Sequence, residues 1–102
     1  MELDPDTLTV RDNRAANRYE IVVDDQVAEL DYELVGGRID YLHMGVPHAL
    51  EGHGVASRIA RFALDDARAR GLRVVPLCPY MEHYLDEHPE DQDLVAPDPR
   101  MA

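Results

Sequence analysis

The chain has 102 residues, with 21 Asp and Glu against 10 Lys and Arg, and a formal net charge of −11. This length fits one domain with its own core, and the single cysteine, Cys78, excludes a framework of disulfides. All ten basic residues are arginine, which excludes chemistry that needs a lysine ammonium, such as a Walker-type phosphate loop or a Schiff base.

The acidic charge also bears on partners and location. Nucleic acids and anionic membranes both attract positively charged surfaces, so neither is expected as a partner. No apolar run approaches the roughly 18 residues of a spanning helix. Residues 1–5 lack the positive and then apolar pattern of a signal peptide. We therefore expect a soluble, cytoplasmic protein.

The first 46 residues predict a loose lead-in followed by an antiparallel meander. Residues 1–16 are mostly polar and are expected to be loose. From Arg18 onward, apolar residues alternate with polar ones in three segments separated by turn residues. These segments are expected to be strands, over residues 18–23, 27–35 and 38–46. Glu29, Asp31 and Glu33 would form a solvated face, or alternatively attract a cationic acceptor.

A helix, a short strand and a second helix are expected next. Apolar residues recur with helical spacing from Val55, and Gly71 is a usual residue just past a helix end. Residues 72–78 have the pattern of a short buried strand, and residues 81–87 that of a helix.

The acidic segment of residues 90–102, with its prolines, is expected to be a disordered tail. The order of elements predicts an α+β fold with helices packed on a mostly antiparallel sheet. We expect residues 1–102 to form a single domain whose core spans about residues 18–95.

The junction between the third strand and the long helix carries a candidate anion site. Gly52-x-Gly54-x-Ala56 places small residues where a helix exposes unpaired N–H groups and the positive end of its dipole. A phosphate could approach this backbone closely, and Ser57 could add a hydroxyl. The same glycines also fit a turn that merely needs positive φ. A dinucleotide fold is disfavoured, because the preceding strands form hairpins.

Four motifs occur in order between residues 18 and 95. They are His43-Met44-Gly45-Val46-Pro47, Glu51-Gly52-His53-Gly54-Val55-Ala56-Ser57, Val75-Pro76-Leu77-Cys78-Pro79-Tyr80 and His88-Pro89-Glu90. Together they resemble the small single-domain GCN5-related N-acetyltransferases of the YjdJ-like branch. The resemblance implies a minimal version of that fold and acetyl-CoA as cosubstrate.

The resemblance also implies which residues bind acetyl-CoA. In this family, a loop of the pattern Arg/Gln-x-x-Gly-x-Gly/Ala binds the pyrophosphate through backbone amides. Here the pattern begins at Glu51, and the implied binding residues are Gly52, His53, Gly54, Val55, Ala56 and Ser57. The backbone near Val46 would pair with the pantetheine arm.

Two positions depart from the family's pattern. Glu51 stands where an arginine or glutamine is expected, so pyrophosphate binding would rest on backbone amides, His53 and Arg58. Alternatively, Glu51 points to solvent. Gly45 stands where relatives carry the glutamate of His-Thr-Glu-Val-Pro, a natural general base. The proton of the attacking amine would then pass to His43, to a bound water or to another acid.

The resemblance places Cys78 near the acetyl thioester. We favour its thiol as the acid that protonates the departing CoA thiolate; the alternatives are a thiolate that carries the acetyl group and an inert core residue. Tyr80 and Tyr84 could instead supply the acid, although their i, i+4 spacing also fits packing. No metal is expected. Cys78, His83 and His88 are each five residues apart, which turns successive side chains away from a common helical face.

The implied function is direct transfer of an acetyl group from acetyl-CoA to an amine of a small molecule or peptide, within a ternary complex. The acidic surface favours a cationic acceptor. The short chain leaves the acceptor site open or shared with a partner, which includes a homodimer. The alternative function is a catalytically weak acyl-CoA-binding module that serves as a sensor or partner subunit. The departures at Gly45 and Glu51 favour this alternative.

Overall fold

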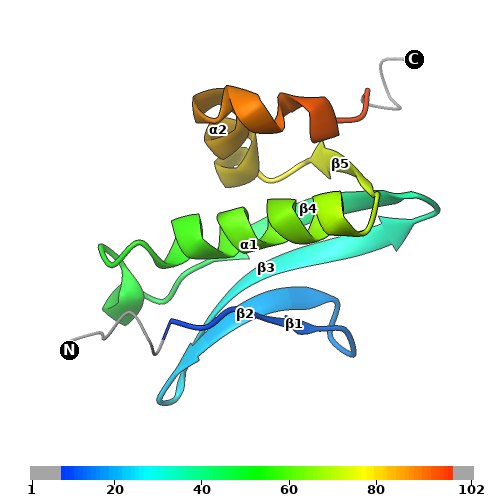
Figure 1. Ribbon diagram of the computed structural model, residues 1–102. Coiled ribbons are helices and arrows are strands. Elements are labelled where there is room, and N and C mark those ends of the chain that lie inside the picture. Colours follow the sequence, from blue (N-terminus) through cyan, green and yellow to red (C-terminus); the bar gives the residue numbers. More distant parts are fainter. Residues whose placement is uncertain (1–7, 98–102) are drawn as a thin grey trace.

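The computed structural model describes residues 8–97. They form an α+β fold with five strands in one sheet (Figure 1). The strands are β1 (Arg11–Asn13), β2 (Arg18–Val23), β3 (Gln26–Val35), β4 (Arg38–Gly45) and β5 (Arg73–Pro76). The helices are α1 (Val55–Ala69) and α2 (Pro79–Glu87), with short 3-10 helices η2 (His48–Leu50) and η3 (Pro89–Leu94). The predicted fold class is confirmed, as is the sequence of meander, helix, strand and helix.

Strand pairing follows the chain order, with one change of direction. β1 to β4 pair consecutively and antiparallel, whereas α1 returns the chain so that β5 runs parallel to β4. The pairing of β4 with β5 ends at Tyr41 and Pro76. There the N–H groups of Leu77 and Cys78 both donate to the carbonyl of Tyr41. Beyond this point, within residues 8–97, β4 pairs with β3 alone, so β4 and β5 diverge.

A β-bulge interrupts β4 at the same place. Tyr32 pairs with Tyr41, but Asp31 pairs with His43, which leaves Leu42 as an extra residue on β4. The bulge resets the alternation of side chains along β4. His43 therefore lies on the same sheet face as Asp31, turned away from the core.

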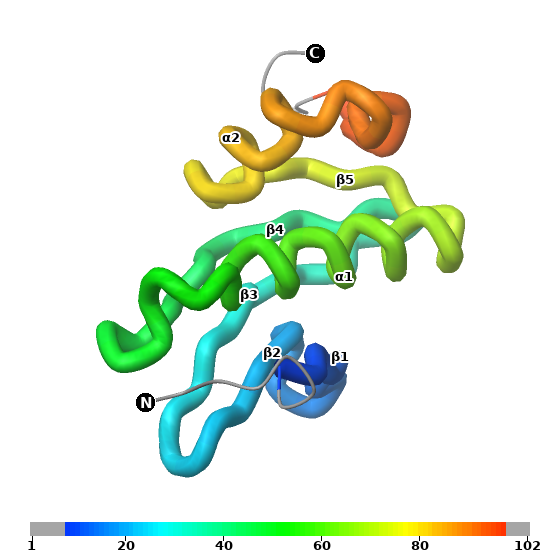
Figure 2. Tube along the Cα trace, turned by 60° about the vertical axis from the view of Figure 1, so that its left-hand side comes forward, coloured from blue at the N-terminus to red at the C-terminus, as the bar shows by residue number. Residues whose placement is uncertain are grey.

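The core lies between the sheet and α1. Figures 1 and 2 show α1 along one face of the sheet, with α2 and η3 beside β5. The buried face of α1 consists of Val55, Ile59, Ala60, Ala63, Leu64 and Ala67. Its small residues let the helix approach the sheet closely, and the hydroxyl of Tyr41 donates to the carbonyl of Ala63 at 2.7 Å. Gly71, with a φ of +67°, follows the helix end as predicted.

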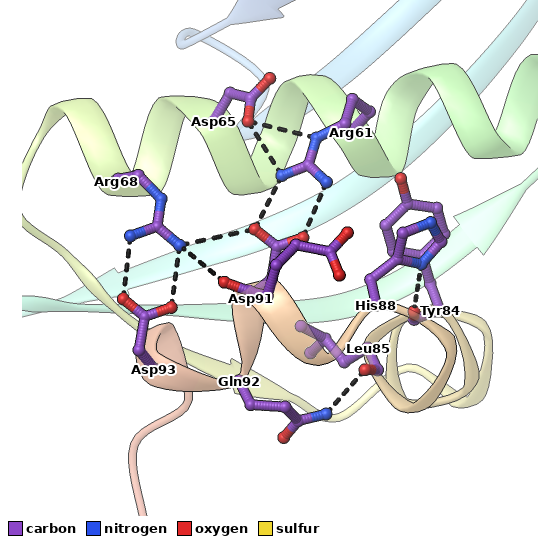
Figure 3. A network of polar contacts seen from close by, with 10 residues as sticks. Arg61, Asp65, Arg68, Tyr84, Leu85, His88, Asp91, Gln92 and Asp93 are labelled. Atoms are coloured by element: carbon purple, nitrogen blue, oxygen red, sulfur yellow. Dashed lines mark hydrogen bonds and ion pairs between the residues drawn. The ribbon is translucent and has the colours of Figure 1, made fainter.

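Two segments predicted to be loose are ordered. β1 lies within the expected lead-in and pairs with β2. η3 lies within the expected tail, where Asp91 is buried and accepts hydrogen bonds from Arg61 of α1 at 2.7 and 2.8 Å (Figure 3). Arg68 binds both carboxylate oxygens of Asp93 at 2.8 Å. The prediction of a disordered tail is wrong over residues 90–97, because its acids pair with the arginines of α1. The rest of the predicted lead-in and tail, residues 1–7 and 98–102, lies outside the described residues.

The segment after η3 covers the outer edge of β5. Val95 forms a parallel bridge with Val74, and the N–H of Ala96 donates to the Val74 carbonyl at 2.8 Å. Among residues 8–97, no helix is long and apolar enough to cross a bilayer.

Candidate functional site

A small groove of about 200 Å³ lies where the chain passes from β4 into α1. It is lined by Val46, Leu50, Glu51, Gly52, Gly54, Val55, Ala56, Ser57 and Tyr80. The fold thus brings most of the predicted acetyl-CoA-binding residues together; His53 is exposed and does not line the groove. Two larger hollows, of about 450 and 480 Å³, lie elsewhere, and Arg58 lines the second of these instead of the groove.

The first turn of α1 presents backbone donors to this groove. Gly54 caps the helix with a φ of +72°, and Gly52 has a φ of +80°, a left-handed conformation that glycine adopts without strain. The first helical hydrogen bond runs from the N–H of Arg58 to the Gly54 carbonyl. Among residues 8–97, no side chain caps α1, and the first turn of the helix holds no acidic residue. The N–H groups of residues 55–57 and the helix dipole can therefore act on an anion.

Glu51 lies at the rim of the groove beside His48. Its Oε2 is 3.1 Å from Nδ1 of His48, and both side chains are exposed. When His48 is protonated, it offsets part of the carboxylate charge that would oppose a bound anion.

Tyr80 forms the wall opposite the start of α1. Burial raises the pKa of Tyr80, with smaller contributions from Tyr84 and Glu87, while a side-chain hydrogen bond from Ser57 lowers it. The pKa of Tyr80 is raised overall, so its hydroxyl stays protonated at neutral pH. The i, i+4 spacing of Tyr80 and Tyr84 predicts that the two rings pack together, and they do stack, at 6.4 Å between centroids. Pro79 is the sequence signal that distinguishes Tyr80 from Tyr84, because a proline favours the start of a helix and so places Tyr80 in the first turn.

Cys78 and Tyr84 are core residues in this structure. Cys78 is 3% exposed, belongs to the hydrophobic core cluster and does not line the groove. Tyr84 is also buried, and its ring stacks on His88 at 3.9 Å. The fold therefore brings Tyr80, rather than Cys78 or Tyr84, to the groove.

His43 does not line the groove and lies among charged side chains. It is exposed and, in the sheet register, stands opposite Asp31. Glu29, two residues before Asp31, pairs with Gly45. The guanidinium of Arg18 donates to Glu29 at 3.1 Å and to the buried Glu20 at 2.8 Å. Within residues 8–97, no group of three or more His, Cys, Asp or Glu is arranged to hold a metal ion.

Comparisons with known proteins match this architecture. A family model described as GCN5-related N-acetyl-transferase matches residues 18–94. Protein NATD1 of Gallus gallus and protein NATD1 of Homo sapiens are each 41% identical over 68 residues, which is 66% of this chain. These matches span 62% and 60% of the two relatives, so about two-fifths of each lies outside the compared region.

A solved structure is similar over nearly the whole fold. It is the NMR solution structure of a GCN5-like candidate N-acetyltransferase from Staphylococcus aureus, with a TM-score of 0.69 and 26% sequence identity. The match covers 88% of this chain and 89% of that one. The family model spans most of the chain and includes the whole groove, and the fold agrees. The chain therefore belongs to the GCN5-related N-acetyltransferase family.

Proposed function

We propose that the protein transfers the acetyl group of acetyl-CoA directly to an amine of a small molecule or peptide within a ternary complex. The observation that carries this proposal is the groove itself. It combines the uncapped start of α1, the end of β4 and the hydroxyl of Tyr80. The start of α1 can bind a pyrophosphate, the end of β4 can pair with a pantetheine arm, and Tyr80 can give a proton to a departing thiolate.

Binding would use backbone more than side-chain charge. The pyrophosphate would lie on the N–H groups of residues 55–57, with the hydroxyl of Ser57 beside them. The pantetheine arm would pair with β4 over residues 42–46, the edge that β5 has left. Local donors have to outweigh a chain charge of −11, which repels the cosubstrate and favours a cationic acceptor.

The chemistry needs a proton acceptor for the amine and a proton donor for the sulfur. The amine nitrogen attacks the thioester carbon, a C–N bond forms, and the C–S bond breaks. We assign the donor role to Tyr80, because its side chain lines the groove while Cys78 is buried. The proton acceptor would come from the other side of β4, where His43 lies.

The test measures CoA release with acetyl-CoA and a panel of amines, while acetyl-CoA binding is followed separately by thermal shift. We expect Tyr80→Phe to lower kcat at least tenfold, within the usual range for a lost general acid, and to leave binding intact. Tyr84→Phe, a change in the stacked partner, should leave kcat within about twofold. A loss of kcat in Cys78→Ser with Tyr80→Phe unchanged would move the acid role to Cys78. An absence of CoA-dependent stabilisation in the wild type would overturn the proposal.

A second candidate function is an acyl-CoA-binding module, a sensor or partner subunit with weak catalysis. Two observations favour it: Gly45 supplies no carboxylate, and the carboxylate of Glu51 stands at the rim of the anion site. Tight acetyl-CoA binding with no turnover on any amine would select this function over transfer.

A further inference from the structure

On the sheet face opposite α1, the side chain of Glu29 reaches over the backbone of Gly45. The two residues are register partners across β3 and β4. A Cβ placed on Gly45 would lie 3.6 Å from Cγ and 3.7 Å from Oε1 of Glu29, and 3.4 Å from Nε2 of His43. The carboxylate of Glu29 and the imidazole of His43 thus border the same small space above residue 45.

The conformation of Gly45 does not require glycine. Positive φ values occur at Gly36, Gly52, Gly54 and Gly71, and Gly45 is not among these positions. The contacts of a Cβ there would be ordinary van der Waals contacts. Neither the backbone nor the packing requires glycine here. Because Gly45 has no side chain, a small space stays open above it, and Glu29 of the neighbouring strand borders that space.

The surroundings of Glu29 suit a group that accepts a proton. Burial raises the pKa of Glu29, the hydrogen bond and charge of Asp31 raise it further, and Arg18 opposes them. The charge of Arg18 is shared with Glu20, which holds its Nε at 2.8 Å. The side chain of Glu29 is still 29% exposed, so a substrate can reach it.

We propose that Glu29 is the base that takes the proton from the acceptor amine, so that the carboxylate enters the reaction from β3 instead of β4. This rests on the proposed acetyl transfer. The neutral amine nitrogen attacks the thioester carbon and a C–N bond forms. The nitrogen then loses its proton to the carboxylate of Glu29, and the C–S bond breaks. The thiolate takes the proton of Tyr80, and solvent returns both side chains to their starting protonation states.

The test compares Glu29→Gln with wild type, using acetyl-CoA and an amine that the wild type acetylates, between pH 5 and 9. We expect kcat to fall about 100-fold, as for a lost general base, with acetyl-CoA binding unchanged within twofold. The rise of kcat with pH on the acidic side should disappear. Asp25→Asn changes an exposed carboxylate in the turn between β2 and β3 and should leave kcat within twofold.

Two further variants separate a base from a structural residue. Asp31→Asn removes a neighbour that raises the pKa of Glu29, so the acidic limb of the profile should move to lower pH. Arg18 and Glu20 on β2 and His43 on β4 also face Glu29 and are left unchanged. Glu29→Ala combined with Gly45→Glu returns a carboxylate to this space from β4. The kcat of this double variant should be at least tenfold higher than the kcat of Glu29→Ala.

The outcomes are distinguishable. A wild type that acetylates amines while Glu29→Gln keeps its kcat overturns the assignment of Glu29 and leaves the proposed function intact. A loss of kcat that follows a loss of thermal stability, without recovery in the double variant, also overturns the assignment. A wild type with no transfer on any amine overturns both.

Discussion

Removal of the Asp91 carboxylate is expected to loosen η3 from α1. The side chain is 3% exposed and bonds both terminal nitrogens of Arg61, at 2.7 and 2.8 Å. Arg68 approaches it to 3.5 Å (Figure 3). Asp91→Ala removes all of these contacts at once and leaves the two arginines in place.

The size of the effect follows from burial and from what Arg61 retains. A hydrogen bond to a charged group contributes roughly 1.5–3 kcal/mol, and breaking a buried ion pair costs more than breaking an exposed one. Arg61 is 36% exposed and keeps Asp65 as a partner, so water can replace part of what it loses. We expect Asp91→Ala to lower the free energy of unfolding by about 2–3 kcal/mol. For a domain of this size, that is a fall of roughly 10–20 °C in Tm.

The assay is thermal and urea unfolding at pH 7, followed by circular dichroism. The matched control is Asp65→Ala, which removes a carboxylate from the same guanidinium of Arg61. Asp65 is 63% exposed, so this change should cost no more than about 0.5 kcal/mol. Equal losses of stability in the two variants would refute the argument that burial gives the Asp91 contacts their strength.

Two further predictions concern acid stability and the glycine loop. The hydrogen bond from Arg61 lowers the pKa of Asp91, and that from Arg68 lowers the pKa of Asp93. Carboxylates with a lowered pKa stabilise the fold above the pKa of the unfolded state, which is about 4. This stabilisation is lost as the pH falls through the pKa values of the folded state. Tm should therefore fall below pH 4, and less so in Asp91→Ala; an equal slope in the variant would contradict this. Gly54→Ala forces a φ of +72° on alanine, which costs about 1–2 kcal/mol, and should weaken acetyl-CoA binding in a thermal-shift titration. Gly37→Ala, at a glycine without positive φ and with open space around it, is the control, and equal effects of the two changes would argue against a role for the loop geometry.

Most of the fold could be predicted because its elements each bury one face. Alternation marks β2 to β4, and helical spacing marks α1. β1 carries no such mark: Arg11, Asp12 and Asn13 are polar, and tertiary contacts hold the strand, among them the hydroxyl of Tyr32 that donates to Asp12 at 2.6 Å. η3 was missed for a similar reason, since the partner of Asp91 lies 30 residues earlier in the chain.

The candidate site was predictable in part. The glycine pattern locates the loop because left-handed conformations and free N–H groups are local properties of the chain. The position of Glu29 beside His43 depends instead on the bulge at Leu42. Without that extra residue, His43 would fall on the core face of β4, and nothing in the local pattern of apolar and polar residues indicates where a bulge will form.

The bridge between Val95 and Val74 has a consequence for self-association. Exposed strand edges are templates on which folded chains add further strands and aggregate. Here the segment after η3 covers the outer edge of β5, and the opposite edge strand, β1, has three residues, one of which is Arg11. The stretch of β4 that β5 leaves unpaired is short, because the pairing ends at Tyr41 and β4 itself ends at Gly45. Within residues 8–97, the fold can therefore leave part of the β4 backbone unpaired without presenting a long free edge to neighbouring molecules.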